Sequence, residues 1–482
     1  MIEIVLNQNL YEQDLRPLFM AFFPGEPITV RQPEEKEGVW DRQLLVIYRE
    51  KTVKLCWQDR QGTLAEDQTQ VDYSDYKETK NRVKRMLYTM LSQYTGKKMP
   101  WGSLTGIRPT KIAMGMLEQG IEEKEILRHY EEEYFCSRRK AEMSLEIAKR
   151  ERELLSRIDY EDGYSLYIGI PFCPTTCLYC SFTSYPISKW VRRVDEYLDA
   201  LEKEIDFTAE HFENKKLNTV YFGGGTPTTL TAEQLERILS KVNASFDLRY
   251  LQEFTVEAGR PDSVTREKLD VLKRQGVTRI SINPQTMKQE TLKIIGRQHT
   301  VEQVKSVFAM AREAGFTNIN MDIILGLPNE TLEDVTHTME ELSLLHPDNI
   351  TVHSLALKRA AKLNIFKEAY QDYRMENSDA QINLTEDYAR ALGMNPYYLY
   401  RQKNMSGNLE NVGYAIPGKE GLYNILIMEE KQTIVALGAG ATTKAVFGDR
   451  IERCENVKDI KTYLEKLEEM LDRKRRLFGF EQ

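Results

Sequence analysis

Three cysteines lie within a stretch of eight residues. They form the strongest candidate in the sequence for a metal-binding or catalytic site. Cys173, Cys177 and Cys180 form a C-x3-C-x2-C run directly after an apolar segment. Clustered thiolates bind zinc or iron–sulfur centres. Structural zinc needs four ligands, and no fourth Cys or His is nearby, whereas three thiolates can bind three irons of a cubane and leave the fourth open. The pattern favours an iron–sulfur centre over its alternatives, a zinc site or chance clustering.

Two further motifs follow the cysteines at the ends of apolar segments. Gly223-Gly224-Gly225-Thr226-Pro227 is a glycine run, which lets backbone approach a ligand closely and exposes N–H and C=O groups. Glu257 ends the next apolar segment, where its carboxylate could accept hydrogen bonds from ribose hydroxyls. An N-cap or an exposed charge is the alternative for Glu257, and an ordinary turn is the alternative for the glycines.

The elements that position these motifs alternate between strand and helix from residue 160 to about 360. The predicted strands are Tyr164–Pro171, Thr219–Phe222, Glu253–Glu257, Arg279–Asn283, Asn318–Ile324 and Asn349–Leu355. The predicted helices between them are Val194–Phe212, Ala232–Phe246, Thr265–Gln275, Val301–Ala314 and Leu332–Leu345. Such repeats imply a parallel sheet of an α/β fold, either doubly wound or a partial barrel, because parallel strands need long crossovers. Functional loops should then follow the C-terminal ends of the strands.

The flanking segments have different patterns. Residues 1 to about 80 predict a few antiparallel strands, and residues 80–158 predict helices. The last 120 residues are mixed, with a strand predicted at Leu422–Met428 and a terminal helix at Val457–Leu477. We therefore expect three domains: an N-terminal α+β accessory domain (1–158), a core (160–360) and a mixed C-terminal domain (361–482) that covers the substrate.

Composition restricts the function further. The 482 residues carry 66 Lys and Arg against 74 Asp and Glu, a formal charge of −8, which excludes a generally basic protein that coats nucleic acid. No apolar run approaches the roughly 20 residues that cross a bilayer. The first residues lack the pattern of a secretory signal, so we expect a cytoplasmic protein. Cys56, Cys136 and Cys454 stand alone and are interpreted as packing residues.

Together, the cysteine run, the glycine run and Glu257 resemble the radical S-adenosylmethionine (SAM) superfamily. The resemblance implies a [4Fe–4S] cluster on Cys173, Cys177 and Cys180, whose open iron binds SAM. One-electron reduction then cleaves SAM to methionine and a 5′-deoxyadenosyl radical. It also implies the SAM-binding roles of five further residues: Tyr179 near the adenine, Gly224, Gly225 and Thr226 at the amino group, and Glu257 at the ribose. Arg260 is expected to pair with the SAM carboxylate.

A narrower resemblance, to the oxygen-independent coproporphyrinogen III oxidase group, covers residues 160–360. The motifs are Tyr167-Ile168-Gly169-Ile170-Pro171-Phe172-Cys173, Ser281-Ile282-Asn283-Pro284-Gln285, Gly296-Arg297, Asn320-Met321-Asp322 and Leu325-Gly326-Leu327-Pro328. This resemblance implies that Gln285, Arg297 and Asp322 surround a second SAM and that backbone at Ala356 contacts the first. Tyr167 is expected to bind cofactor, and all four of Tyr167, Gln285, Arg297 and Asp322 are expected to be catalytic. A structural Arg297–Asp322 ion pair is the alternative.

The flanks resemble the HemZ-type, coproporphyrinogen dehydrogenase-like branch of this group. The matching segments are 104–111, 398–405, 407–408 and 413–414. Two positions depart from the oxidases: Phe182 stands where they have a fourth Cys, and Gly169 where they have a His. Phe182 is the pattern of a related haem-chaperone branch, but the His-Asn and Tyr-Trp run of that branch is absent.

The resemblance implies a radical SAM oxidoreductase that decarboxylates two propionates of coproporphyrinogen III to vinyl groups, giving protoporphyrinogen IX in haem biosynthesis. The alternatives are a haem-binding chaperone, or a radical SAM enzyme that acts on haem by methyl transfer or ring opening. The expected partners are the porphyrinogen or haem and a one-electron donor such as flavodoxin or ferredoxin, with no membrane span and no nucleic acid. Four cations are candidates for the substrate carboxylates, with ordinary surface charge as the alternative: Arg108, Lys111, Arg401 and Lys403.

Overall fold

The computed structural model describes residues 1–106, 108–356, 361, 365, 373–375, 377–402 and 409–480. The chain forms two compact units. The first comprises Met1–Lys149, Asn377–Asp379 and Leu399–Asn411, and the second Arg150–Glu376, Ala380–Tyr398 and Val412–Gln482. The first unit is therefore discontinuous in sequence, since the chain returns to it twice.

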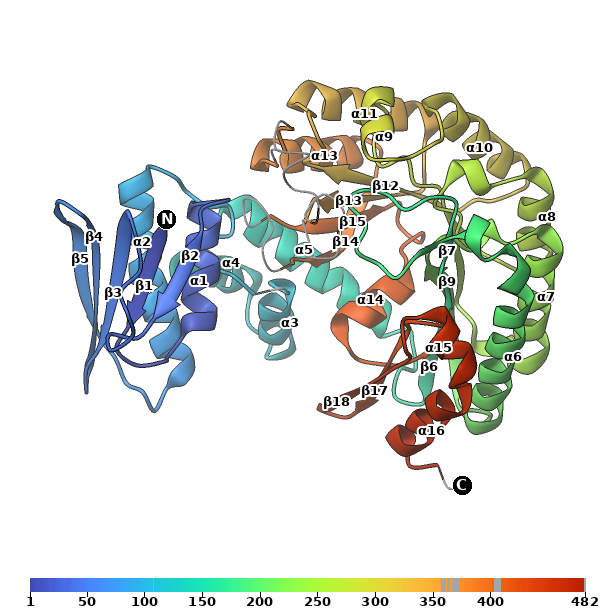
Figure 1. Ribbon diagram of the computed structural model, residues 1–482, viewed down its shortest axis with the longest axis horizontal. Coiled ribbons are helices and arrows are strands. Elements are labelled where there is room, and N and C mark those ends of the chain that lie inside the picture. Colours follow the sequence, from blue (N-terminus) through green and yellow to red (C-terminus); the bar gives the residue numbers. More distant parts are fainter. Residues whose placement is uncertain are drawn as a thin grey trace. The chain divides into compact units, whose positions relative to one another are not determined.

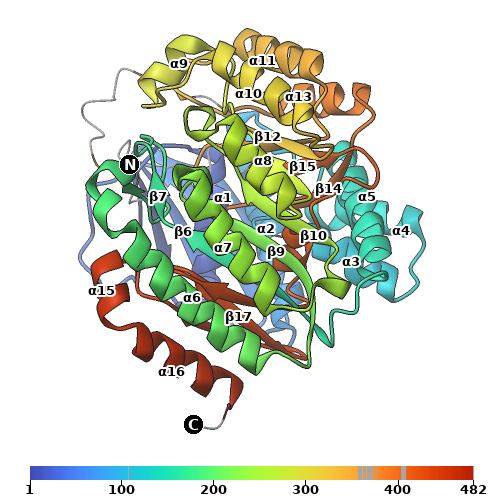
Figure 2. The same ribbon diagram turned by 90° about the vertical axis from the view of Figure 1, so that its right-hand side faces the viewer.

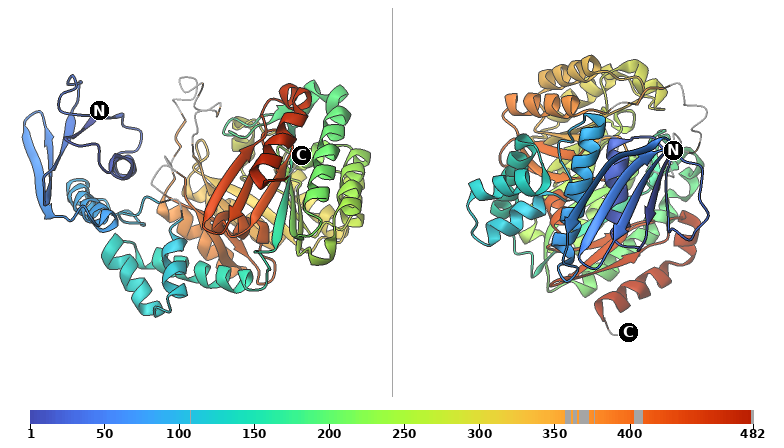
Figure 3. Two further views of the ribbon diagram at one scale, coloured as in Figure 1. Left: turned by 90° about the horizontal axis from the view of Figure 1, so that it is seen from below. Right: turned by 90° about the vertical axis from the view of Figure 1, so that its left-hand side faces the viewer.

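The first unit contains a five-stranded sheet of order β2-β1-β3-β4-β5 (Figure 3, right). Its strands are β1 (Ile2–Leu6), β2 (Ile28–Arg31), β3 (Arg42–Tyr48), β4 (Thr52–Asp59) and β5 (Gly62–Gln70). The prediction of antiparallel strands is correct for β3, β4 and β5 but wrong for β1, which pairs in parallel with both β2 and β3. The reason is helix α1 (Glu12–Phe22), which the sequence analysis missed and which supplies the crossover that parallel pairing needs.

Helices complete the first unit. They are α2 (Tyr76–Thr95), α3 (Thr110–Glu118), α4 (Glu123–Tyr134) and most of α5 (Arg138–Leu155). Asp75 caps α2 by accepting a hydrogen bond from the N–H of Glu78, and Gly96 ends it in the left-handed conformation. The buried face of α2 joins that of α1 and the sheet in one apolar core around Phe19, Trp57 and Leu87.

The second unit is built on an eleven-stranded sheet of order β14-β15-β13-β12-β11-β10-β9-β6-β16-β17-β18. Its central strands are β6 (Gly163–Ile170), β9 (Lys216–Gly224), β10 (Glu253–Glu257), β11 (Arg279–Ser281), β12 (Ile319–Leu325) and β13 (Asn349–Ser354). Every neighbouring pair among these six is parallel, which confirms the predicted α/β architecture. The described sheet is open, with β14 and β18 at its edges.

Helices cover the outer face of these six strands (Figures 1 and 2). They are α6 (Val194–His211), α7 (Ala232–Ser245), α8 (Arg266–Arg274), α9 (Gln289–Ile294), α10 (Val301–Glu313) and α11 (Leu332–Leu345). Thr231, Thr300 and Thr331 begin three of them with reciprocal capping boxes. The register aligns the C-terminal ends of the strands: Gly169 lies opposite Gly223, and Glu257 opposite Ser281. The motifs that follow these strands therefore gather at one edge of the sheet.

The C-terminal segment extends the same sheet on both sides (Figure 3, left). Its elements are α13 (Asp379–Ala391), β14 (Asn395–Tyr400), β15 (Asn411–Ala415), α14 (Leu422–Glu429), β16 (Thr433–Leu437), β17 (Thr442–Phe447), β18 (Arg450–Glu455), α15 (Ile460–Glu465) and α16 (Leu467–Phe478). The predicted strand at Leu422–Met428 is wrong, because this segment is helix α14. The predicted terminal helix is two helices, separated at Lys466. Across the described ranges, no helix combines the length and apolarity that a membrane span requires.

Candidate active site

The cysteine run forms a loop between β6 and α6 that begins in the short strand β7 (Phe172–Cys173). All three thiols are free; Cys177 is buried and the other two are partly exposed. Burial raises the pKa of the Cys173 thiol to about 11, so this residue is no reactive thiolate by itself. In the described part of the chain, no three Cys, His, Asp or Glu side chains are grouped to hold a single metal ion. Thiols that bind three different irons of one cluster need no such convergence.

The glycine run lies against the start of the cysteine loop. The N–H of Gly225 donates to the carbonyl of Ile170 at 2.8 Å, and that of Thr226 to the carbonyl of Phe172 at 2.7 Å. A Cβ on Gly225 would lie 2.5 Å from the Phe172 oxygen, so only glycine permits this approach. The Thr226 hydroxyl is 3.4 Å from Cys173 Sγ. Gly224 has φ +104°, a conformation that side chains rarely adopt.

Glu257 lies at the end of β10 beside a stack of tyrosines. Tyr221 donates its hydroxyl proton to Glu257 Oε1 at 2.6 Å. Burial raises the pKa of the Glu257 carboxyl to about 7, although the Tyr221 bond opposes the shift. The Tyr221 ring stacks on Tyr167 at 6.2 Å and on Tyr423 at 4.4 Å between centroids. The N-cap and exposed-charge alternatives for Glu257 are therefore wrong, since the carboxylate is only partly exposed and accepts its hydrogen bond from a phenol.

Tyr423 is a residue of this site that the sequence analysis missed. It belongs to α14, which lies about 165 residues beyond Glu257 in the sequence. Its signal is hidden because six of the seven residues in Leu422–Met428 are apolar, which favours a strand over an amphipathic helix. The Tyr423 side chain is buried, and its ring also stacks on Tyr167.

Arg260 lies between the end of β10 and the cysteine loop. Its guanidinium binds both oxygens of Asp262, at 3.0 and 2.8 Å, and also contacts Thr175 and the Cys177 sulfur. These contacts tie the end of β10 to the cysteine loop. The pairing of Arg260 with the SAM carboxylate stays a prediction.

Arg297 lies among the loops rather than beside Asp322. It donates to the carbonyls of Gly259 at 3.1 Å and Asn283 at 2.7 Å, and to the hydroxyl of Tyr179 at 3.2 Å. The Nε atom of Arg297 is buried and makes no hydrogen bond with the described residues. The alternative of a structural Arg297–Asp322 ion pair is wrong, because Asp322 bonds Asn320 at 2.7 Å and pairs with His353 at 3.8 Å.

Gln285 and Asp322 are joined through backbone. The Gln285 N–H donates to the Asp322 carbonyl at 3.0 Å. Gln285 has φ +68°, an uncommon and strained conformation for a non-glycine residue, and its buried Oε1 makes no hydrogen bond with the described residues. Burial opposes ionisation of Asp322, yet bonds from His353 and Asn320 hold the pKa of Asp322 below its ordinary value. The site thus offers an amide oxygen that makes no hydrogen bond with the described residues, together with the carboxylate of Asp322.

The remaining predicted residues have less defined surroundings. Ala356 follows β13 and is half-buried. Arg108, Lys111 and Arg401 belong to the first unit, where Arg401 is buried and Lys111 is exposed. Lys403 lies outside the described residues. The assignment of these cations to substrate carboxylates stays a prediction.

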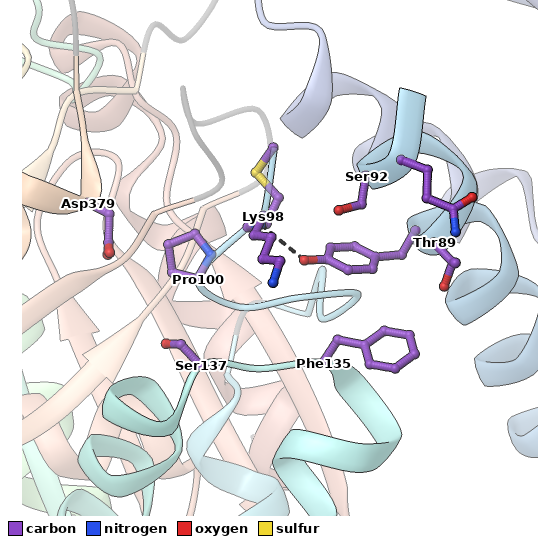
Figure 4. A pocket seen from close by; sticks show the side chains of 10 residues that line it. Thr89, Ser92, Lys98, Pro100, Phe135, Ser137 and Asp379 are labelled. Atoms are coloured by element: carbon purple, nitrogen blue, oxygen red, sulfur yellow. Dashed lines mark hydrogen bonds between the residues drawn. The ribbon is translucent and has the colours of Figure 1, made fainter. Parts of the chain in front are cut away.

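The first unit also has a cavity of about 460 Å³ (Figure 4). Tyr88 on α2, whose hydroxyl accepts a hydrogen bond from the Met99 N–H, stacks on Phe135 at its wall. The other lining residues are Thr89, Ser92, Gln93, Lys98, Met99, Pro100, Ser137 and Asp379. None of them is among the predicted site residues.

Comparison with known proteins finds relatives over much of the chain. The model of the radical SAM superfamily matches residues 167–342. The chain is 41% identical over 405 residues to the oxygen-independent coproporphyrinogen-III oxidase-like protein HemZ of Bacillus subtilis (strain 168), covering 83% of this chain and 81% of that one. It is 33% identical to the haem chaperone HemW of the same organism, covering 63% and 76%. The fold resembles that of coproporphyrinogen III oxidase (HemN) from Escherichia coli, with a TM-score of 0.52, 23% identity, and 66% and 73% of the two chains covered.

The parallel sheet, the cysteine loop and these matches define a radical SAM protein, a class that uses a [4Fe–4S] cluster and SAM. Within that class the chain belongs to the HemZ-type family of oxygen-independent coproporphyrinogen-III oxidase-like proteins. The residues present fit these cofactors. Three free thiols share one loop, and the glycine run packs against that loop. Buried polar atoms of Gln285 and Arg297 still lack partners among the described residues.

Proposed function

We propose that the chain oxidatively decarboxylates propionate side chains of coproporphyrinogen III to vinyl groups and so forms protoporphyrinogen IX. The observation that carries the proposal is the group of three free thiols, the glycine run and Glu257 at one edge of the parallel sheet. The 41% identity to the oxidase-like protein HemZ supports this choice of substrate.

Each propionate loses one hydrogen atom from its β-carbon, one electron and CO2, and the two remaining carbons become a vinyl group. A cluster on Cys173, Cys177 and Cys180 with bound SAM supplies the radical chemistry that removes the hydrogen atom. The electron passes to a separate acceptor, which the proposal requires. A one-electron donor such as flavodoxin or ferredoxin reduces the cluster.

The chain's own residues bind and orient in this proposal. Ionised Glu257 accepts hydrogen bonds from ribose hydroxyls, and the glycine run offers backbone groups to the amino group of SAM. Gln285, Arg297 and Asp322 receive a second SAM: the guanidinium suits a carboxylate and the carboxylate of Asp322 suits an ammonium. The stacked rings of Tyr167, Tyr221 and Tyr423 restrict the access of water to Glu257. Such positioning is the protein's contribution when a cofactor does the chemistry.

A haem chaperone is the second candidate. It is supported by the 33% identity to HemW and by Phe182, which stands where the oxidases have a further cysteine. The Phe182 side chain is 72% exposed in the cysteine loop.

One experiment separates the candidates. Anaerobically reconstituted protein is incubated with SAM, a reductant and either coproporphyrinogen III or haem, and the pigments are separated by chromatography. We expect protoporphyrinogen IX from the first substrate and unchanged haem from the second. Haem that is bound and released unchanged, with no decarboxylation, would favour the chaperone. Methylated or ring-opened haem would instead indicate an enzyme that acts on haem.

The cluster assignment has its own control. The Cys173→Ala, Cys177→Ala and Cys180→Ala variants should each lose SAM cleavage, because each removes one iron ligand. Cys56→Ala should retain it, since Cys56 is a buried residue of β4 in the first unit, which does not contain the cysteine loop. A cubane absorption spectrum in the triple alanine variant would show that the ligands lie elsewhere.

A further inference from the structure

Arg260 is a buried cation that contacts the cysteine loop from the end of β10. Its side chain is 3% exposed. Nη1 donates to the Thr175 carbonyl at 3.3 Å and lies 3.6 Å from Cys177 Sγ, while both Nη atoms are 3.2 Å from the Thr175 hydroxyl. The other side of the guanidinium is held by Asp262. The two Nη atoms thus fix the loop and place positive charge beside one of its sulfurs.

Asp262 orients this guanidinium. It accepts from Nε at 3.0 Å and from Nη2 at 2.8 Å, the two-pronged geometry that planar guanidinium groups form with carboxylates. Asp262 is the middle residue of the single 3₁₀ turn η5 (Pro261–Ser263). The Ser263 hydroxyl donates a hydrogen bond to the Arg260 carbonyl at 2.7 Å. The guanidinium therefore cannot turn away from the loop without breaking its two bonds to Asp262.

A hydrogen-bond donor and a positive charge at a cluster sulfur favour the reduced, more negative cluster. Hydrogen bonds to the sulfurs and net charge are among the features that set the reduction potential of iron–sulfur centres. The loop tether acts separately, through the Thr175 carbonyl and hydroxyl, by holding the backbone between Cys173 and Cys177.

We propose that Arg260 is a positioning residue of the iron–sulfur centre, which anchors the cysteine loop and, by donating to the Cys177 sulfur, raises the reduction potential of the bound cluster. The inference rests on the proposed function in one respect, namely that Cys177 is a cluster ligand. It does not depend on which porphyrin is the substrate.

The test uses the full chain, reconstituted anaerobically without any porphyrin. Iron and sulfide content are measured first, and the midpoint potential of the cluster is then determined by titration with detection by electron paramagnetic resonance. We expect Arg260→Met to shift the midpoint to a more negative value, because the reduced cluster loses a cation and a donor. Arg266→Met is the matched control: Arg266 is half-exposed and pairs with Asp270 on α8, so its midpoint should equal the wild-type value. A fully loaded Arg260→Met protein with the wild-type midpoint would overturn the proposal.

Asp262→Asn is the second variant. It tests the effect of Arg260 on the midpoint potential even if Arg260→Met does not fold, which could happen because that variant leaves Asp262 unpaired. It keeps the cation and neutralises the anion beside it, so the midpoint should shift in the opposite direction, to a less negative value. A wild-type or more negative midpoint in Asp262→Asn would then contradict the proposal. Failure of the proposed function gives a different result, since a protein that does not convert coproporphyrinogen still shows these shifts.

Discussion

Glu257 titrates in the neutral range, which makes ligand binding at the end of β10 depend on pH. Burial is the main cause of its pKa of about 7, and the Tyr221 hydroxyl stabilises the ionised form. In the folded chain Glu257 stays protonated at pH values above 4.5, the ordinary pKa at which the unfolded chain loses the proton. The free energy of unfolding therefore falls as pH rises from 4.5 toward 7. Ligand binding has the opposite sign, because only the carboxylate accepts two hydrogen bonds from a diol.

Replacing Glu257 by Ala should weaken SAM binding by on the order of 10- to 150-fold, the value of hydrogen bonds to a charged group. The affinity of the wild type for SAM should rise as pH passes through about 7, and this pH-dependent rise should be absent in Glu257→Gln. In Tyr221→Phe the rise in affinity should occur at higher pH, because the Glu257 carboxylate loses the hydrogen bond that the Tyr221 hydroxyl donates. Calorimetry across this range measures each effect, with Tyr164→Phe, a buried tyrosine of β6, as the control. A pH-independent wild-type affinity would remove Glu257 from the site.

Arg297 joins three loops and, in the proposal, binds the second SAM. Arg297→Ala should leave uncoupled SAM cleavage at the cluster largely intact but abolish substrate turnover. Tyr179→Phe removes only the bond between Arg297 and the cysteine loop and should leave cleavage at the wild-type rate. Cleavage is measured as 5′-deoxyadenosine and turnover as CO2. Normal turnover in Arg297→Ala, or a chain that does not fold, would contradict the second-site assignment.

At the scale of elements, the sequence predicts what local patterns determine. The six parallel strands and their helices are correct because each strand is a short apolar run and the helices carry capping residues such as Thr231 and Thr300. Helix α14 was missed because Leu422–Met428 is buried on several sides, which hides its helical period. The hydrogen bonds of Arg260 and Arg297 could not be predicted either. They depend on how loops from different parts of the chain are positioned in three dimensions, which no spacing in the sequence specifies.

The terminal helix α16 is fixed to α6 by one buried carboxylate (Figure 2). Glu204 accepts hydrogen bonds from the Gly438 N–H at 2.6 Å, Asn456 at 2.9 Å and Tyr463 at 2.5 Å, and pairs with the fully buried Lys474. Tyr197, which accepts from the Ala439 N–H, donates to the Gly169 carbonyl at the end of β6. The C-terminal helices are thereby linked to the strand that leads into the cysteine loop.

Lys474→Met should lower the free energy of unfolding by about 3–5 kcal/mol, because it leaves Glu204 as an uncompensated buried charge. The double variant Glu204→Leu/Lys474→Met should recover much of this loss, since no lone charge remains. Urea unfolding measures both. Arg193→Ala breaks an exposed pair at the start of α6 and should change stability little. Equal midpoints for Lys474→Met and the wild type would mean that Glu204 carries no charge in the folded chain.

At the scale of the whole molecule, the first unit depends on residues distant in sequence. Glu410, which is fully buried, pairs with Lys140 at 2.7 Å and accepts from the Trp101 indole at 2.6 Å. Arg401 donates to the Leu104 carbonyl at 2.8 Å and lies over the Trp101 ring. Arg401 and Glu410 are therefore buried parts of this unit.

Lys140→Met should destabilise the first unit selectively by about 3–5 kcal/mol, because the charge on Glu410 loses a buried cation. Hydrogen exchange should accelerate in the described part of 399–411 and around Trp101, while the amides of β9 keep their protection. Lys149→Met breaks the exposed Lys149–Glu123 pair and serves as the control. Uniform acceleration across both units would show that they unfold together.

This discontinuity also orders events during synthesis of the chain on the ribosome. About 250 residues separate Lys149 from the start of the segment Leu399–Asn411. At about 5–20 residues per second, the first unit waits roughly 12 to 50 seconds for this segment to be made. Lys140 and Trp101 meanwhile lack their partner Glu410, so the first unit is incomplete while the parallel strands of the second are already emerging. The N-terminal part of the nascent chain is therefore the part most in need of protection by chaperones, although it is made first.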